Sequence, residues 1–105
     1  MKIIKQMQNI TIQLKGKEAE GFVIPLGNVN LVFVKTENGL IGCGAFDVMA
    51  LEKFGYPAAK VKPRGDSVKD IDDLLAGTIA AVNPSCEKLG VKTGMSGEEA
   101  AQLIL

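Results

Sequence analysis

One stretch, from Asn38 to Phe54, constrains the fold of this chain more than any other. It reads Asn-Gly-Leu-Ile-Gly-Cys-Gly-Ala-Phe-Asp-Val-Met-Ala-Leu-Glu-Lys-Phe. The Asn-Gly pair favours a type I′ hairpin turn, because both residue types tolerate a positive φ. The glycines on either side of Cys43 permit a bulge or a close backbone approach, and Asp47 is a good helix N-cap. The stretch therefore predicts a strand that leads into a short, apolar and buried helix from Val48 to Phe54.

The residues before this stretch predict an antiparallel sheet. Ile10 to Leu14 alternates apolar and polar residues, as a half-buried strand does, and Glu20 to Leu26 predicts a second strand. Leu31 to Val34 is a continuous apolar run, which is typical of a strand covered on both faces. We expect this third strand to be central or to lie in a subunit interface. The first eight residues break the alternation and are either a separate strand or a bulged extension.

The second half predicts strands that alternate with short capped helices. Two segments have the composition of strands: Ala58 to Pro63 and Thr78 to Val82. Three helices carry start signals, which are Ser67 as a cap, Asn83 followed by proline, and a Ser96 to Glu99 capping box. The order of elements predicts the α+β class, with an antiparallel β N-terminal half and a βαβ-like half whose short helices pack on the sheet.

Length and composition limit the class of protein. At 105 residues we expect a single domain, with an N-terminal β region over about residues 1–44 and a mixed α/β region over about 45–105. The absence of an apolar stretch near 20 residues argues against a membrane span, and the N-terminus does not resemble a signal peptide. We therefore expect a cytoplasmic protein with reduced cysteines.

Charge and residue usage exclude several chemistries. Twelve basic and twelve acidic residues balance, and one tyrosine with no tryptophan offers little for stacking on bases, so we expect no nucleic-acid partner. The chain contains no histidine, which removes Ser-His and Cys-His pairs and most zinc or iron sites. We expect no cofactor and no metal. These absences favour a protein without catalytic activity over an enzyme.

Cys43 and Asp47 are the candidate catalytic residues. A thiol between two glycines and close to a helix N-terminus has the setting of a nucleophile, so a thiol-dependent enzyme or a redox protein is one hypothesis. Asp47 would lie at the same helix end, and its negative charge opposes formation of a thiolate. The alternative interpretation is a small buried cysteine at a tight strand-to-helix turn.

Lys60, Lys62 and Arg64 are the candidate ligand-binding residues. Alternate positions of a strand place these three cations on one face, where an anionic metabolite is a suitable ligand. The alternative is an edge strand that its charges protect from aggregation. An acidic stripe at Asp66, Asp70 and Asp73 favours a solvated helix face over a divalent cation site.

Two motifs resemble a known family. They are Gly39-Leu40-Ile41-Gly42-Cys43-Gly44-Ala45-Phe46-Asp47-Val48 and Leu89-Gly90-Val91-Lys92-Thr93-Gly94-Met95-Ser96-Gly97. With a looser match at residues 71–75, the chain from about Ile10 onward resembles the YunC-like family of small bacterial and archaeal proteins of unknown function, although Tyr56 to Asp66 departs from the pattern. The resemblance implies that the N-terminal β region forms a tetramer. It implies no activity and no catalytic residue.

The leading hypothesis that follows is a homo-oligomeric binding or interaction module. Its partner is a second copy of the chain, assembled through the N-terminal strands. The thiol-dependent enzyme at Cys43 and the anion binder at Lys60, Lys62 and Arg64 are the alternatives.

Overall fold

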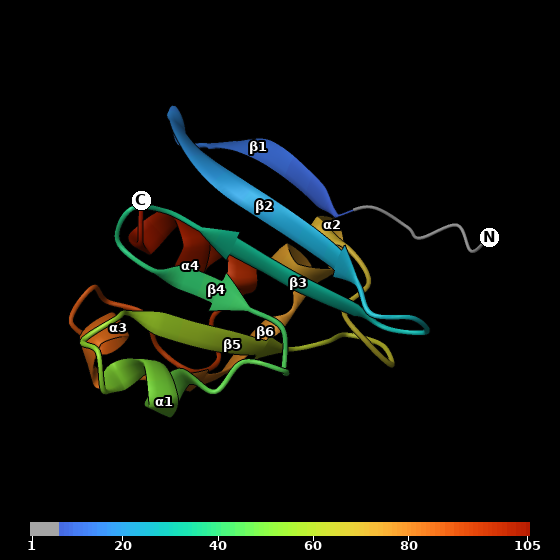
Figure 1. Cartoon of the computed structure of the whole chain (residues 1–105). Helices are drawn as coiled ribbons and strands as arrows, with labels where there is room; N and C mark the ends of the chain where they lie inside the picture. The colour runs from blue at the N-terminus through green and yellow to red at the C-terminus, as the bar shows by residue number, and fades with distance from the viewer. Residues whose placement is uncertain (1–6) are drawn as a thin grey trace.

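A computed structural model describes residues 7–105. Six strands form one sheet in sequence order, and four short helices pack on it (Figure 1). This arrangement confirms the predicted α+β class. The prediction for the first eight residues was a separate strand or a bulged extension, and most of these residues lie outside the described part of the chain. The strands are β1 (Gln8–Leu14), β2 (Lys17–Pro25), β3 (Asn30–Lys35), β4 (Leu40–Gly42), β5 (Ala58–Lys62) and β6 (Thr78–Val82), and the helices are α1 (Val48–Glu52), α2 (Ile71–Ala76), α3 (Pro84–Glu87) and α4 (Gly97–Leu103).

The direction of the strands divides the sheet into the two predicted halves. β1 to β4 are antiparallel neighbours, with Phe22 opposite Phe33 and Val34 opposite Ile41. β5 runs parallel to β4, so β4, α1 and β5 form the βαβ-like unit, because parallel neighbours require a crossover. β6 then returns antiparallel to β5. None of the helices within residues 7–105 is long and apolar enough to cross a bilayer.

The two faces of the sheet carry separate cores. The main core lies on the face covered by α2 and α4 and includes the fully buried Val32, Ile41 and Leu74. A smaller core lies under α1 and contains Leu40, Val48 and Ala58. The C-terminal end of the chain also packs on the main core, because Ile104 is completely buried there.

β3 is central, as predicted, but it is not fully covered on both faces. Val32 and Val34 are buried, whereas Leu31 and Phe33 on the other face are half-buried. On that second face the Phe33 ring stacks on Phe22, with the ring centres 4.8 Å apart. Within one chain the cover of this second face is incomplete, because α1 covers only the part over β4 and β5, and cover by a second subunit stays a prediction.

α1 starts where predicted but is a surface helix. Asp47 is its N-cap, and its carboxylate accepts a hydrogen bond from the Ala50 N–H at 3.0 Å. Val48 is buried, yet Met49 is 55% exposed and Phe54, beyond the helix end, is 84% exposed. The prediction of a buried core helix is therefore wrong, because the helix uses one narrow face to cover the smaller core.

Two predicted local details are also wrong. Neither Asn38 nor Gly39 has a positive φ, so the turn between β3 and β4 is not type I′, whereas Lys15 and Gly16 have φ values of 50° and 77° in the turn between β1 and β2. The second helix does not begin at Ser67. α2 begins at Ile71, because Asp70 accepts a hydrogen bond from the Asp73 N–H and so acts as its N-cap.

Candidate functional site

Cys43 lies directly after β4, at one end of the main core. Its side chain is 6% exposed, and its backbone N–H donates to the Val32 carbonyl at 3.0 Å. It also lines a cavity of about 270 Å³, to which Asp66 and Ser67 contribute the polar walls. Both cysteines of the chain are free thiols. A buried thiol without an imidazole base fits the structural interpretation, and the nucleophile hypothesis stays a prediction.

The structure does not bring the other catalytic candidate to this cavity. Asp47 is exposed, caps α1 and is not among the residues that line the cavity with Cys43. The close approach predicted at the two glycines is found at Gly42 alone, where a Cβ atom would overlap the Phe46 ring. A Cβ atom at Gly44 would meet nothing within 4 Å. Close packing therefore explains the glycine before Cys43, Gly42, but not the glycine after it, Gly44.

The three candidate cations are not arranged as one row. Lys60 and Lys62 are on one face of β5, but Arg64 lies beyond the end of the strand, in the loop before α2. β5 lies between β4 and β6, so the edge-strand interpretation is wrong. Although β5 is an interior strand, Lys62 is exposed and Lys60 is half-buried. Anion binding at the three cations stays a prediction.

The acidic stripe is used by the backbone of the loop and helix. Asp70 caps α2, and Asp73 accepts a hydrogen bond from the Lys69 N–H at 3.1 Å, while Asp66 lies in the loop outside the helix. Within residues 7–105 no group of three or more acidic or cysteine side chains is placed to hold a metal ion. The arrangement thus favours helix capping over cation binding.

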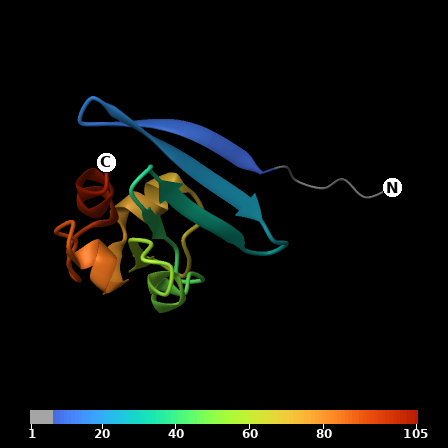
Figure 2. The same ribbon diagram turned by 60° about the vertical axis from the view of Figure 1, so that its left-hand side comes forward.

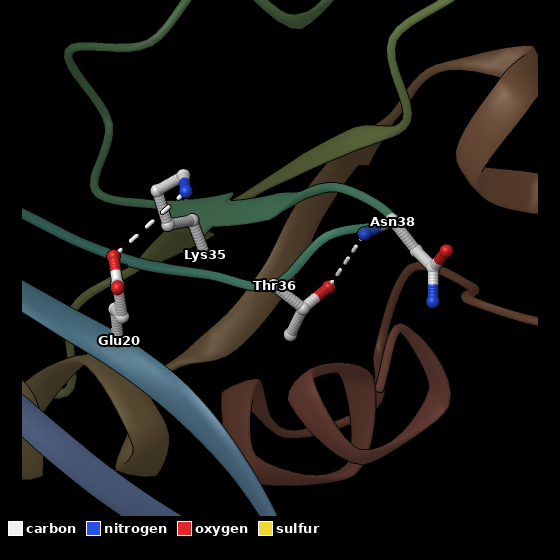
Figure 3. Close-up of polar contacts among 4 residues, drawn as sticks. All are labelled: Glu20, Lys35, Thr36 and Asn38. Carbon is white, nitrogen blue, oxygen red and sulfur yellow. Dashed lines mark hydrogen bonds and ion pairs between the residues drawn. The ribbon is translucent and has the colours of Figure 1, made fainter.

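A second cavity, of about 560 Å³ and thus larger than the one beside Cys43, was not predicted from the sequence. It is lined by residues of β2, by the end of β3 and by the turn that follows β3. Figure 3 shows three of the lining residues, Glu20, Lys35 and Thr36. Lys35 Nζ and Glu20 Oε2 form an ion pair at 3.8 Å, and both side chains are about half exposed. Its charged lining residues are Lys17, Glu18, Glu20, Lys35 and Glu37. Charges of both signs that remain in contact with water give this cavity no strong preference for one kind of ligand.

The polar residues beside this cavity have structural partners. The Thr36 hydroxyl donates to the Ile104 carbonyl at 2.6 Å and accepts from the Asn38 N–H at 3.0 Å (Figure 3). The Asn38 side chain donates to the Ile104 and Leu105 carbonyls at 3.2 and 3.1 Å. These bonds satisfy carbonyl groups at the end of α4 and explain why the Asn-Gly turn departs from type I′.

Asn83 is a buried hydrogen-bonding centre that the sequence predicted only as a cap. Its side-chain N–H₂ group donates to the Val48 and Tyr56 carbonyls at 2.9 and 2.8 Å. Its side-chain oxygen accepts from the Ala58 and Cys86 N–H groups at 3.1 and 3.0 Å. One fully buried side chain therefore joins α1, the start of β5 and α3. Nearby, burial raises the pKa of the Cys86 thiol to about 11.

Glu52 holds α3 against α1 and yields a prediction for pH. Its carboxylate accepts from the Ser85 N–H at 2.7 Å and the Ser85 hydroxyl at 2.8 Å, and the backbone bond above all lowers the Glu52 pKa from 4.5. A lowered pKa stabilises the fold above pH 4.5, and this contribution disappears as the pH falls through the folded-state value. We expect Glu52→Gln to reduce stability at neutral pH, with a difference from the wild type that vanishes in acid.

Urea unfolding of both chains at several pH values measures this difference. An equally large loss at acidic and neutral pH would show that the charge of Glu52 is not the cause. Glu87→Gln is a matched control, because Glu87 is an exposed acid of the adjacent helix α3.

Comparison with known proteins places the chain in a family. Residues 42–104 match the family described as Domain of unknown function (DUF1805). The chain is 36% identical over 95 residues to the uncharacterized protein YunC of Bacillus subtilis (strain 168), which covers 90% of this chain and 94% of YunC. The crystal structure of TA1206 from Thermoplasma acidophilum, a protein of unknown function, matches with a TM-score of 0.85 and 28% identity, over 95% of this chain and 94% of that chain.

These matches confirm the resemblance carried by the two motifs of the sequence. The family match covers more than half of the chain, and it contains the first motif from Gly42 onward and all of the second motif, which leads into α4. The likeness to the TA1206 crystal structure confirms the fold. The chain belongs to the YunC-like DUF1805 family.

Proposed function

We propose that this protein is a cytoplasmic homo-oligomeric interaction module without catalytic activity, whose copies associate through the N-terminal strands. The observation that carries the proposal is the uncovered edge of the sheet at β1. Among the described residues β1 pairs with β2 alone, over all seven of its residues. An edge strand of this length presents unpaired N–H and C=O groups, which favour pairing with another chain.

The opposite edge of the sheet differs from the β1 edge, because the start of β6 is paired. The Ile79 N–H donates to the Met95 carbonyl at 2.8 Å, and the Gly94 N–H donates to the Ile79 carbonyl at 2.9 Å. Thr78 also forms a bridge with Ser96. The segment before α4 thus pairs with the first two residues of β6, whereas both views show β1 as the outer edge, with no other described element beyond it (Figures 1 and 2).

The face of the N-terminal strands supports the same proposal. Away from α2 and α4, this face carries the stacked Phe22 and Phe33 rings and the half-buried Ile24 and Leu31. An open sheet face with this much apolar surface gains from burial against another chain. Assembly into the tetramer that the family resemblance implies would bury this apolar face.

The first test replaces an apolar side chain of the β1 edge with a charge. Ile10 is 42% exposed on β1, and we expect Ile10→Lys to lower the assembly mass to half of the wild-type value or less, because an edge lysine opposes pairing between strands. Sedimentation velocity at micromolar concentration measures the mass. Met49→Lys is the matched control, since Met49 is an exposed apolar residue of α1, distant from β1 in the chain. A wild-type mass of one chain would contradict the proposal.

A further inference from the structure

One end of the molecule brings together two loops that are distant in the sequence. The turn between β2 and β3 lies beside the loop between β5 and α2 (Figure 1), and the Asn30 side chain joins them by donating to the Lys69 carbonyl at 2.8 Å. We call this end, formed by residues 26–31 and 63–68, the tip. It is a different surface from the β1 edge.

The tip carries protruding apolar side chains beside a hollow. Leu26 and Val29 are 59% and 52% exposed, so this turn leaves two large apolar side chains in contact with water. Both line the cavity of about 270 Å³ whose buried wall includes Cys43. The remaining apolar lining consists of Leu31, Ala45, Pro63 and Val68. A surface that presents exposed apolar side chains at a hollow with an apolar lining is suited to contact with its own copy.

The charges at the rim of this cavity are also self-complementary. Arg64 and Asp66 are both exposed and lie two residues apart, and Asp66 lines the cavity itself. Within residues 7–105 neither side chain forms an ion pair, and the one ion pair described joins Lys35 and Glu20. Around a twofold axis, Arg64 of each copy can meet Asp66 of the other, so that two opposite-charge pairs form at once.

We infer that the tip docks on the tip of a second copy of this chain. In this contact Leu26 or Val29 of one copy enters the cavity of the other, and two Arg64 to Asp66 pairs flank the apolar centre. The contact does not depend on pairing at β1. Two different twofold contacts on one chain are what a closed tetramer of dihedral symmetry needs, and the tip supplies the second one.

The size of the tip sets the expected strength. Two short loops bury less than the roughly 800 Å² per partner of a standard interface, so the tip contact alone should be weak and concentration dependent. In a tetramer the β1 contact holds two tips close together and raises their effective concentration. The charge pairs at the rim fix the orientation of the two copies and make the contact sensitive to salt.

The test uses the Ile10→Lys variant, in which the β1 contact is removed, so that the tip contact is measured alone. In this variant the charge of Arg64 or of Asp66 is reversed. Arg64→Glu and Asp66→Arg each place like charges across the twofold axis, and we expect each to weaken dimerisation at least about tenfold. An equimolar mixture of the two variants restores opposite charges in both pairs, so the mixture should form dimers again. Lys62→Glu is the control, because Lys62 is an exposed cation of β5 that does not line the cavity.

Two measurements report the outcome. Sedimentation velocity gives the mass, and alkylation of Cys43 followed by intact mass spectrometry gives the cover of the cavity, with the completely buried Cys86 as an internal reference. We expect Cys43 to react more slowly as the protein concentration rises, and this dependence to disappear in Arg64→Glu. Circular dichroism of each variant verifies that it is folded.

The results separate this inference from the proposal at β1. A mass of four chains that falls to two in Ile10→Lys and to one in Ile10→Lys with Arg64→Glu supports both contacts. A mass of two chains that falls to one in Arg64→Glu, but not in Ile10→Lys, supports the tip and removes the β1 contact. Unchanged mass in Arg64→Glu and Asp66→Arg, or a mixture that stays dissociated, overturns the tip contact whatever happens at β1.

Discussion

Asn83→Asp should destabilise the protein by about 3–5 kcal/mol at neutral pH, which is a large part of the stability of a small domain. The substitution keeps the shape of the side chain but removes both donors to the Val48 and Tyr56 carbonyls. It also buries a carboxylate at a position with zero exposure and sets its charge beside carbonyl oxygens. Urea unfolding followed by circular dichroism at equal protein concentrations measures the change.

The pH dependence of this variant identifies the cause of the loss. Burial near carbonyl oxygens raises the pKa of the introduced carboxyl in the folded state. The penalty is therefore smallest when the carboxyl is protonated and grows as the pH rises above its unfolded-state pKa. Asn28→Asp makes the same chemical change at an exposed loop position and should be nearly neutral. A loss below about 1 kcal/mol at Asn83, the net value of one ordinary hydrogen bond, would show that the centre is dispensable.

Features that depend on neighbours in the chain could be predicted from the sequence. The Asn83 and Ser96 caps are found where their side chains indicated, and the capping box at Ser96 includes Glu99 as expected. β6 runs over the predicted residues, because alternating patterns and turn signals act over a few positions. The α+β class followed from the order of these local elements.

Features that depend on contacts distant in the sequence could not be predicted. The position of β5 inside the sheet follows from its pairing with β4 on one side and β6 on the other, which no local pattern records. The turn at Asn38 departs from its local preference because its side chain bonds to the end of α4, 66 residues away. Tertiary contacts overrode the intrinsic preference at both places.

The candidate sites also combine local features, which the sequence predicts, with distant contacts, which it does not. The sequence singled out Cys43 because its flanking glycines are a local signal, but the cavity beside it is made by Leu26, Val29 and Asp66 from two other loops. Arg64 was grouped with Lys60 and Lys62 by strand alternation, which ends at Lys62. The structure moves Arg64 to the tip, where its partner in our inference is Asp66 of a second copy.

Gly97→Ala should cost about 3 kcal/mol, the upper part of the range for overpacking, because the new methyl group has no space. A Cβ atom at Gly97 would overlap the Leu74 carbonyl oxygen and would lie 3.1 Å from the Leu75 Cα. Both are backbone atoms of α2, so no side-chain rotation relieves the overlap. The Gly97 N–H also donates to the Gly77 carbonyl at 3.0 Å, which fixes the start of α4 against the end of α2.

Gly44→Ala is the matched control for this prediction. A Cβ atom at Gly44 meets nothing within 4 Å, and its φ is not positive. The control should be neutral or stabilising by about 0.4–1 kcal/mol, since alanine restricts the unfolded chain. Thermal unfolding of the two variants beside the wild type measures the contrast. Equal midpoints for Gly97→Ala and Gly44→Ala would show that α2 and α4 can separate without cost, so the family motif that ends at Gly97 would need an explanation other than close packing of these helices.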